Sequence, residues 1–199
     1  TLIESNLPSD QVVAQQVIEK CLPYAGNAIR LGITGVPGAG KSTLAKEIAK
    51  QTGCIIVDHD ISKTSLMTSF QELQLDERYC GKISYEMDFS LVDFYLGQGR
   101  SVILDSPCLY EVILEKGQTL AKKHHASYKF IECYLNDFEE VNKRLQSRTR
   151  HISQIEKCAS PESLYRANEH CKKPQSNYLT VQTAAPLATY IGKVMEYIK

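Results

Sequence analysis

The sequence has no excess of charge of either sign, because 23 lysines and arginines balance 23 aspartates and glutamates. A neutral chain gives no general support for binding to nucleic acid or to an anionic membrane. The sequence also lacks an apolar stretch as long as a membrane span, and its first residues, TLIESNLPSD, are neither basic nor followed by an apolar signal core. We therefore expect a soluble protein of the cytoplasm.

The seven cysteines include no CxxC pair, and they are scattered along the chain in an odd number. Several lie inside apolar, strand-like runs, which indicates reduced thiols rather than a disulfide framework. Internal repeats, low-complexity segments and linkers are also missing, so 199 residues suit a single globular domain.

Short apolar runs alternate with stretches of helical periodicity along most of the chain. The runs expected to be strands are 29–34, 54–57, 101–107, 128–135 and 178–183. Strands separated by helices require crossover connections and a parallel sheet that is covered on both faces. We predict an α/β fold: a three-layer sandwich with a small helical lid. Residues 1–28 are expected to form a helical extension packed on the core, and residues 29–199 the main domain.

The stretch GVPGAGKST lies between the first predicted strand and a predicted helix. This is the sequence and the context of the phosphate-binding loop of nucleotide-binding proteins. The glycines let successive backbone N–H groups surround a phosphate chain, and the helix N-terminus favours an anion. Lys41 would reach the terminal phosphates and the Ser42 hydroxyl would hold Mg²⁺. The predicted nucleotide-binding residues are Gly35, Val36, Pro37, Gly38, Ala39, Gly40, Lys41, Ser42 and Thr43.

From about Arg30 onward, the chain resembles the small P-loop kinases, which include gluconate kinases, chloramphenicol phosphotransferases, zeta-toxin-like kinases and polynucleotide 5′-hydroxyl kinases. The segments that carry the resemblance, in this order, are GVPGAGKST, CIIVDHDISK, GRSVILD, RLQSR and YLTVQT. The resemblance implies an ATP- and Mg²⁺-dependent transfer of the γ-phosphate to a hydroxyl of a small molecule. It also implies a lid at about residues 144–175.

Two aspartates, Asp58 and Asp60, follow the second predicted strand. Phosphoryl transfer needs a carboxylate near the acceptor hydroxyl to orient it and to take its proton. We expect the end of this strand to lie beside the phosphate loop. Among the similar kinases the acceptor-facing aspartate matches Asp60 better than Asp58, and the other aspartate is left to cap the following helix.

Arg144 and Arg148 are four residues apart in a predicted helix, so both can point toward the nucleotide if one helix face covers the site. A guanidinium there would stabilise the charge of the transferring phosphoryl group. The resemblance matches the lid arginine best to Arg148, with Arg144 and Arg150 as further candidates. The alternative is a solvated basic face paired with the glutamates at positions 139 and 140.

Asp105 ends the strand VILD and is similar to the second carboxylate of P-loop proteins, which binds Mg²⁺ directly or through water. The next residues, SPC, depart from the usual pair of adjacent acids, so Asp105 is a candidate for either metal or substrate contact. The resemblance also places the nucleotide base near Thr183 and Pro186.

Two other functions remain open on the sequence. The segment RLGITGVPGAGKST also resembles the loop of GTPase switches and metallochaperones, but Asn142-Lys143 does not continue into the Asn-Lys-x-Asp pattern that reads guanine. A nucleotide-binding interaction protein would leave the ordered aspartates and arginines without a role. A polynucleotide 5′-hydroxyl kinase is a further form of the first hypothesis, although the neutral charge does not favour a long nucleic-acid track.

Overall fold

Five parallel strands form the centre of the structure, a computed structural model that describes residues 5, 7–21, 28–70 and 77–199. The strand order is β2-β3-β1-β4-β5. The strands are β1 (Ile29–Thr34), β2 (Ile55–Asp58), β3 (Val102–Asp105), β4 (Ser127–Tyr134) and β5 (Leu179–Gln182). All five strands expected from the sequence are present, each within two residues of its expected start.

The strand order differs from our expectation in one respect. β3 lies between β2 and β1, so the end of β2 is not directly beside the phosphate loop. Asp58 is paired in register with Asp105, and Asp105 with Ile33. Since the carboxyl ends of parallel strands share one edge, Asp58 and Asp105 lie next to each other at the edge that also carries the phosphate loop.

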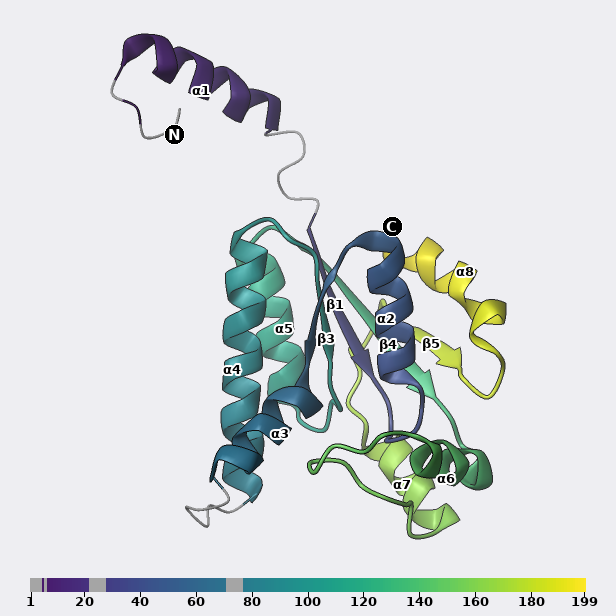
Figure 1. Ribbon diagram of the computed structural model, residues 1–199. Coiled ribbons are helices and arrows are strands. Elements are labelled where there is room, and N and C mark those ends of the chain that lie inside the picture. Colours follow the sequence, from purple (N-terminus) through teal and green to yellow (C-terminus); the bar gives the residue numbers. More distant parts are fainter. Residues whose placement is uncertain (1–4, 6, 22–27, 71–76) are drawn as a thin grey trace.

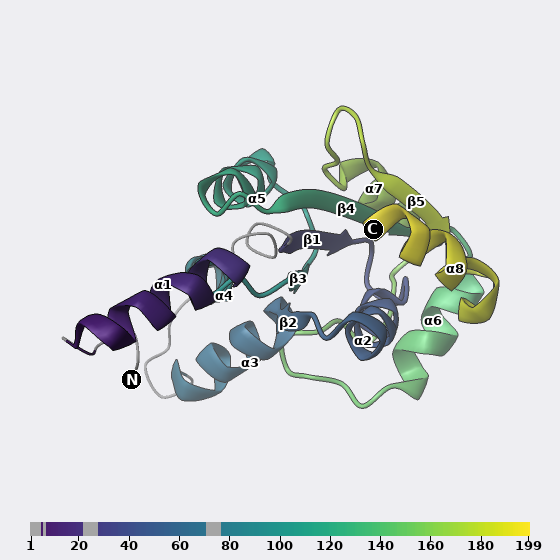
Figure 2. The same ribbon diagram turned by 90° about the horizontal axis from the view of Figure 1, so that it is seen from above.

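Helices cover both faces of the sheet, as predicted (Figures 1 and 2). The helices α2 (Lys41–Thr52) and α8 (Leu187–Ile198) lie on one face. On the other face are α4 (Glu77–Gly97) and α5 (Glu111–Lys123), and α3 (His59–Phe70) packs against α4. Each face has its own apolar core, centred on Leu44 and Ile48 under α2 and on Val92 and Leu96 under α4. The α/β three-layer fold is confirmed.

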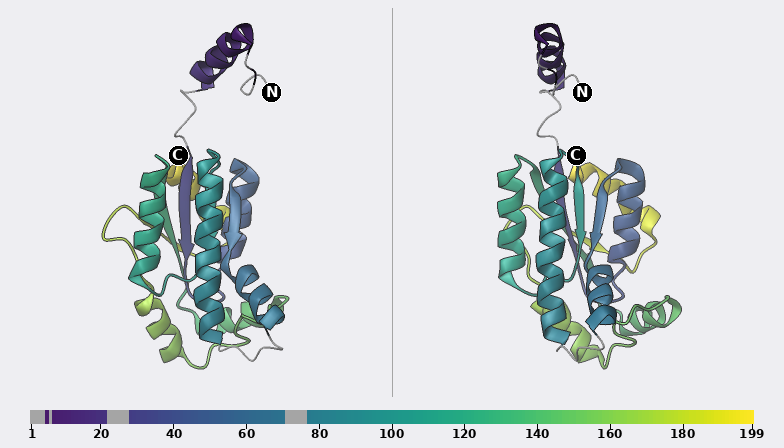
Figure 3. Two further views of the ribbon diagram at one scale, coloured as in Figure 1. Left: turned by 90° about the vertical axis from the view of Figure 1, so that its left-hand side faces the viewer. Right: turned by 60° about the vertical axis from the view of Figure 1, so that its left-hand side comes forward.

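Two shorter helices, α6 (Phe138–Ser147) and α7 (Pro161–His170), lie at the carboxyl end of the sheet (Figures 1 and 3). The side chain of Asp137 accepts the backbone N–H of Glu140 and caps α6. Ser160 and Ser163 form a reciprocal capping box at the start of α7. The segment between these helices belongs to the stretch predicted as a lid, whose function as a lid stays a prediction.

The N-terminal helix α1 (Pro8–Cys21) stands apart from the sheet, at the end opposite to α6 and α7 (Figures 1 and 3). Val12, Val13 and Val17 are exposed on it. The packing of this helix on the core therefore stays a prediction. Within the described residues, no helix has the length and apolar character needed to cross a membrane.

Candidate functional site

The phosphate loop connects β1 to α2 at the carboxyl edge of the sheet, and its shape depends on glycine. Gly35, Gly38 and Gly40 have φ angles of 147°, 84° and 82°, a region that favours glycine. A Cβ on Gly35 would lie 2.3 Å from the backbone oxygen of Cys133 in β4, so no side chain fits there. The neighbouring strand thus fixes the start of the loop.

The helix α2 begins at Lys41, directly after Gly40, and Gly40 provides no side-chain cap. The first turn of α2 contains no acidic residue. Its backbone N–H groups and the positive end of the helix dipole are therefore available to an anion. In this structure the ammonium of Lys41 donates a hydrogen bond to the backbone oxygen of Val36, 3.3 Å away, across the loop itself.

Asp105 is 3% exposed and its Oδ2 has no hydrogen-bond partner among the described residues. Burial raises the pKa of Asp105 to about 6, while Lys41 and a hydrogen bond from Ser42 act in the opposite direction. An unpaired buried carboxylate oxygen beside a phosphate-loop hydroxyl suits Mg²⁺, which prefers oxygen ligands and keeps several waters. Groups of three or more metal-binding side chains are not found in the described residues, so any Mg²⁺ here would share its coordination with phosphate and water.

Asp58 caps α3. Its Oδ1 accepts the backbone N–H of Asp60 at 2.9 Å, which is the bond that an N-cap residue makes. Burial raises the pKa of Asp58, and the backbone hydrogen bond from Asp60 opposes that shift. Asp58 is therefore the aspartate that caps the helix, a role that the sequence could not assign to either Asp58 or Asp60.

Asp60 lies in the first turn of α3 and contacts the segment between α6 and α7. Its Oδ2 accepts a hydrogen bond from Nε2 of Gln154 at 2.5 Å, and its backbone oxygen accepts one from Ser153 Oγ at 3.2 Å. Thr64, one turn further along α3, is 2.8 Å from the same Ser153 hydroxyl. Sequence reasoning did not identify Ser153 or Gln154, since both stand in a polar stretch without periodicity.

Arg144 and Arg148 do not share a helix face, contrary to our expectation. The helix α6 ends at Ser147, and Arg148 has extended backbone angles (φ −88°, ψ 152°). The guanidinium of Arg144 donates to Glu140 Oε1 at 2.7 Å and to the backbone oxygen of Thr183 at 2.8 Å. The pairing with a glutamate that the sequence left as an alternative is present for Arg144, which also links α6 to the loop after β5.

Arg148 donates from NH2 to the backbone oxygen of Ile155 at 3.1 Å, and its buried Nε has no partner among the described residues. Partial burial lowers the pKa of Arg148, whereas the charge of Asp60 acts to raise it. Arg150 donates to the backbone oxygen of Gln154. Asp60, Arg148 and Arg150 therefore converge on one turn, residues 151–155.

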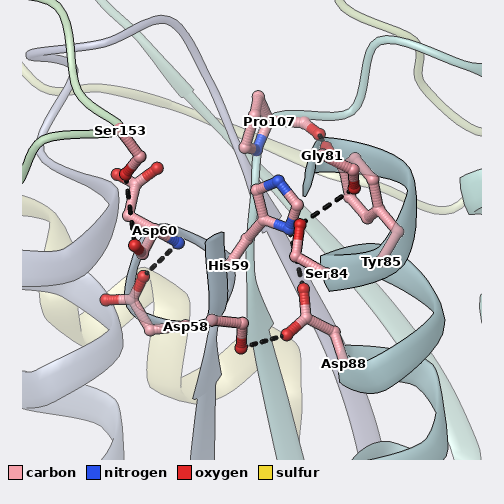
Figure 4. A network of polar contacts seen from close by, with 10 residues as sticks. Asp58, His59, Asp60, Gly81, Ser84, Tyr85, Asp88, Pro107 and Ser153 are labelled. Carbon is pink, nitrogen blue, oxygen red and sulfur yellow. Dashed lines mark hydrogen bonds and ion pairs between the residues drawn. The ribbon is translucent and has the colours of Figure 1, made fainter. Parts of the chain in front are cut away.

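A buried polar network lies directly behind the two aspartates (Figure 4). The Nδ1 of His59 is 2.7 Å from Oδ2 of Asp88 on α4, and Ser62 Oγ donates to Oδ1 of Asp88 at 2.6 Å. The His59 ring stacks on Tyr85 with 3.8 Å between ring centroids. The Tyr85 hydroxyl donates to the backbone oxygen of Pro107, two residues after Asp105. The network thus ties the end of β2, α4 and the end of β3 together.

A hollow of about 470 Å³ lies between the start of α6 and α7. It is lined by Phe138, Leu164, Tyr165 and their neighbours. None of its lining residues belongs to the site predicted from the sequence. The candidate site is therefore the carboxyl edge of the sheet, where the phosphate loop, Asp60 and Asp105 lie, and not this hollow.

The family model described as an AAA domain (AAA_33) matches residues 32–173, which is more than half of the chain. The chain belongs to this family. A second family model, that of the methylmalonyl-CoA mutase-associated GTPase MeaB, matches residues 1–54. The second match covers α1, β1 and the phosphate loop but not the segments that carry Asp60, Asp105 or Arg148.

Curated relatives match the AAA-domain chain in a short segment. GTPase ArgK of Escherichia coli (strain K12) is 54% identical over 43 residues, which are 22% of this chain and 13% of that protein. A protein encoded in the mutB 3′ region of Streptomyces virginiae is 51% identical over 43 residues, 22% of this chain and 46% of that protein. The chain thus spans about an eighth of the GTPase and less than half of the second relative.

Solved structures share the fold over most of the chain. A protein from Chloroflexus aurantiacus that is named as a kinase has a TM-score of 0.66 at 21% identity, and the match covers 87% of this chain and all of that chain. A gluconokinase from Sinorhizobium meliloti has a TM-score of 0.58 at 16% identity, with 87% and 91% covered. At these identities the likeness is one of fold, and it confirms the resemblance to small P-loop kinases at that level.

Proposed function

We propose that the protein is an ATP- and Mg²⁺-dependent phosphotransferase that moves the γ-phosphate of ATP to a hydroxyl group of a small molecule. The observation that carries the proposal is the convergence of Asp60 and Arg148 on the turn 151–155. A base for the acceptor hydroxyl and a cation for the transferring phosphoryl group are needed close together in such a reaction. A protein that only binds nucleotide needs neither.

Each residue of the site would have a separate role in the transfer. The phosphate loop and Lys41 would bind the phosphates of ATP, and Ser42 and Asp105 would hold Mg²⁺, which neutralises charge on the phosphate oxygens when bound. As the acceptor oxygen bonds to the γ-phosphorus and the bond to the β-phosphate oxygen breaks, Asp60 would take the hydroxyl proton. Arg148, whose Nε–H has no partner among the described residues, would donate to the equatorial oxygens.

The nucleotide base would lie near Thr183. This loop is connected to the phosphate-loop region by Arg144, which donates to Thr183 and lies near Gly40: a Cβ on that glycine would be 3.7 Å from NH1 of Arg144. Arg144 is half-buried and already paired with Glu140, so we assign it to positioning and not to the reacting phosphoryl group.

A GTPase is the second candidate, and the similarity of the first 54 residues to the MeaB family favours it. One feature of the structure counts against guanine recognition by an Asn-Lys-x-Asp motif. Asn142, in the single Asn-Lys pair of the sequence, lies in α6 and accepts the backbone N–H of Cys158 with its side chain. It therefore serves as a structural link between α6 and the following segment.

The test is a comparison of ATP and GTP on the purified protein with Mg²⁺, followed by γ-labelled ATP with pools of metabolites, nucleosides and 5′-hydroxyl oligonucleotides. We expect ATP preference and label in a small-molecule pool. Label in the oligonucleotides would identify a polynucleotide kinase instead. GTP preference, with hydrolysis and no labelled acceptor, would overturn the proposal in favour of the GTPase.

A further inference from the structure

The turn 151–155 is linked to the first two turns of α3 by three polar contacts. Gln154 Nε2 donates to Asp60 Oδ2, and Ser153 Oγ donates to the Asp60 backbone oxygen and lies within hydrogen-bond distance of Thr64. Gln154 and Asp60 are 94 residues apart in sequence. The side chain of Gln154 therefore reaches Asp60 only when the segment between α6 and α7 lies against α3.

The amide of Gln154 is oriented by its own turn. Its Oε1 accepts the backbone N–H of His151 at 3.2 Å, and its backbone N–H donates to the His151 oxygen at 3.0 Å. Arg150 and Arg148 hold the backbone oxygens of Gln154 and Ile155. With Oε1 occupied by a donor, the NH₂ end of the amide is the end that faces the carboxylate, which can only accept when it is ionised.

We propose that Gln154 is the positioning residue for Asp60, and this inference depends on the proposed phosphotransferase function. A carboxylate that takes a proton in the transition state must present one oxygen to the acceptor hydroxyl in a fixed direction. A hydrogen bond from Gln154 to Oδ2 fixes the plane of the carboxylate. The described part of the chain donates no hydrogen bond to Oδ1, so this oxygen is left for the acceptor.

The same contact couples the base to the lid. Because Gln154 belongs to the turn that also binds Arg148, Asp60 is oriented only in the conformation that brings the arginine near the site. An open lid would leave Asp60 without its donor. Transfer and lid closure are thus linked through one side chain.

The first arm of the test measures steady-state transfer by Gln154→Ala. The loss of a hydrogen bond to a charged group should lower kcat by about ten- to one-hundredfold. The KM values for ATP and acceptor should stay within about twofold of the wild type, because a residue that acts only by orienting Asp60 adds no binding energy to either substrate. Glu156→Ala, an exposed change two residues further along, is the matched control and should leave kcat unchanged. A raised KM with normal kcat would indicate a merely structural lid contact and would overturn the proposal.

The second arm follows the contact without using activity. Trypsin can cut the lid segment after Arg148, Arg150 and Lys157. Gln154→Glu places a carboxylate against Asp60 and should speed this cleavage by about tenfold or more through repulsion. In the double variant Asp60→Asn/Gln154→Glu the new amide can donate to the new carboxylate, so protection should return although transfer does not. If trypsin cleaves the double variant as fast as Gln154→Glu, the side chains at positions 60 and 154 are not in contact and the proposal is wrong.

The two arms separate this inference from the function on which it depends. If the wild type transfers phosphate, Asp60→Asn abolishes transfer and Gln154→Ala keeps full kcat, then only the positioning role is wrong. If the wild type transfers phosphate to no acceptor, the proposed function fails and the positioning role fails with it.

Discussion

Nδ1 of His59 lies 2.7 Å from Oδ2 of Asp88, and the Asp88 side chain is completely buried. Asp88 also accepts the hydroxyl of Ser62, so both of its oxygens are satisfied. His59 stands between Asp58, the last residue of β2, and Asp60. The contact between His59 and Asp88 therefore anchors the first turn of α3, which carries Asp60, to α4.

Replacing Asp88 by alanine should destabilise the protein strongly, because it removes the acceptor of the buried His59 ring and of the half-buried Ser62 hydroxyl. We expect a loss of about 2–4 kcal/mol in the free energy of unfolding, measured by urea denaturation. Glu86→Gln on the same helix is the control, since Glu86 is exposed and its side chain pairs with Lys116 at the surface. Its effect should stay within about 0.5 kcal/mol. Equal effects of the two changes would contradict the anchoring role.

Lys41→Ala should abolish transfer and weaken nucleotide binding, because the ammonium is the charge that the loop offers to the terminal phosphates. Its present hydrogen bond to Val36 is a single contact within the loop, so stability without ligand should change by less than about 1.5 kcal/mol. Isothermal titration with ATP and Mg²⁺ measures the binding. Lys46→Ala, an exposed lysine further along α2, should bind as the wild type does. Normal turnover by purified Lys41→Ala would refute the assignment of the loop.

The two aspartates after β2 should respond differently to substitution. Asp60→Asn should bind ATP almost normally and lose transfer, because an amide cannot take the proton. Asp58→Ala should lose the cap of α3, which costs about 1 kcal/mol of stability, and keep a measurable rate. Turnover by the two variants, together with their unfolding curves, decides between the roles. If Asp58→Ala abolishes transfer and Asp60→Asn does not, the base has been assigned to the wrong aspartate.

Two glycines with positive φ provide a matched pair. Gly35→Ala should be far more harmful than Gly53→Ala, because a Cβ on Gly35 meets the Cys133 backbone oxygen while a Cβ on Gly53 meets nothing within 4 Å. The change at Gly53 carries only the cost of its backbone conformation, about 1 kcal/mol, and the change at Gly35 should exceed it by at least about 2 kcal/mol. Thermal unfolding of both variants is the measurement. Similar melting temperatures would show that β4 does not constrain the loop.

Asp105 should make the free energy of unfolding depend on pH. Its pKa in the folded protein, about 6, lies above the ordinary value of 3.8, so the folded state prefers the protonated form. This contribution is fully present below pH 4 and is lost as pH rises through 6, by about 3 kcal/mol up to neutral pH. Asp105→Asn should therefore gain stability relative to the ligand-free wild type as the pH is raised from 4 to 7.5. A difference in unfolding free energy that does not vary with pH would contradict this.

The parts of the fold that local sequence determines were predicted correctly. β1 was expected at 29–34 and found there, and α2 begins at Lys41 after the glycine loop, because strand, turn and helix signals follow one another directly. Phosphate binding is readable from sequence for the same reason.

The errors and omissions concern relationships between distant residues. The insertion of β3 between β2 and β1 depends on strand pairing, which no local pattern specifies. No glycine or proline marks the end of α6 before Arg148, so the helix predicted from periodicity continued too far along the chain. The His59–Asp88 pair is 29 residues apart, and nothing in the DHD stretch indicates which helix supplies its partner.

The position of β1 in the sheet has a consequence for how the protein is made. Both neighbours of β1, the strands β3 and β4, come from later in the chain, and Gly35 packs against Cys133 near the end of β4. Domains form during synthesis as their parts leave the ribosome, and contacts between distant segments wait for the later one. The phosphate loop is translated before both of these strands, and we expect it to take its binding shape only after β4 has been made. A nascent chain that ends before residue 127 should not yet hold a nucleotide.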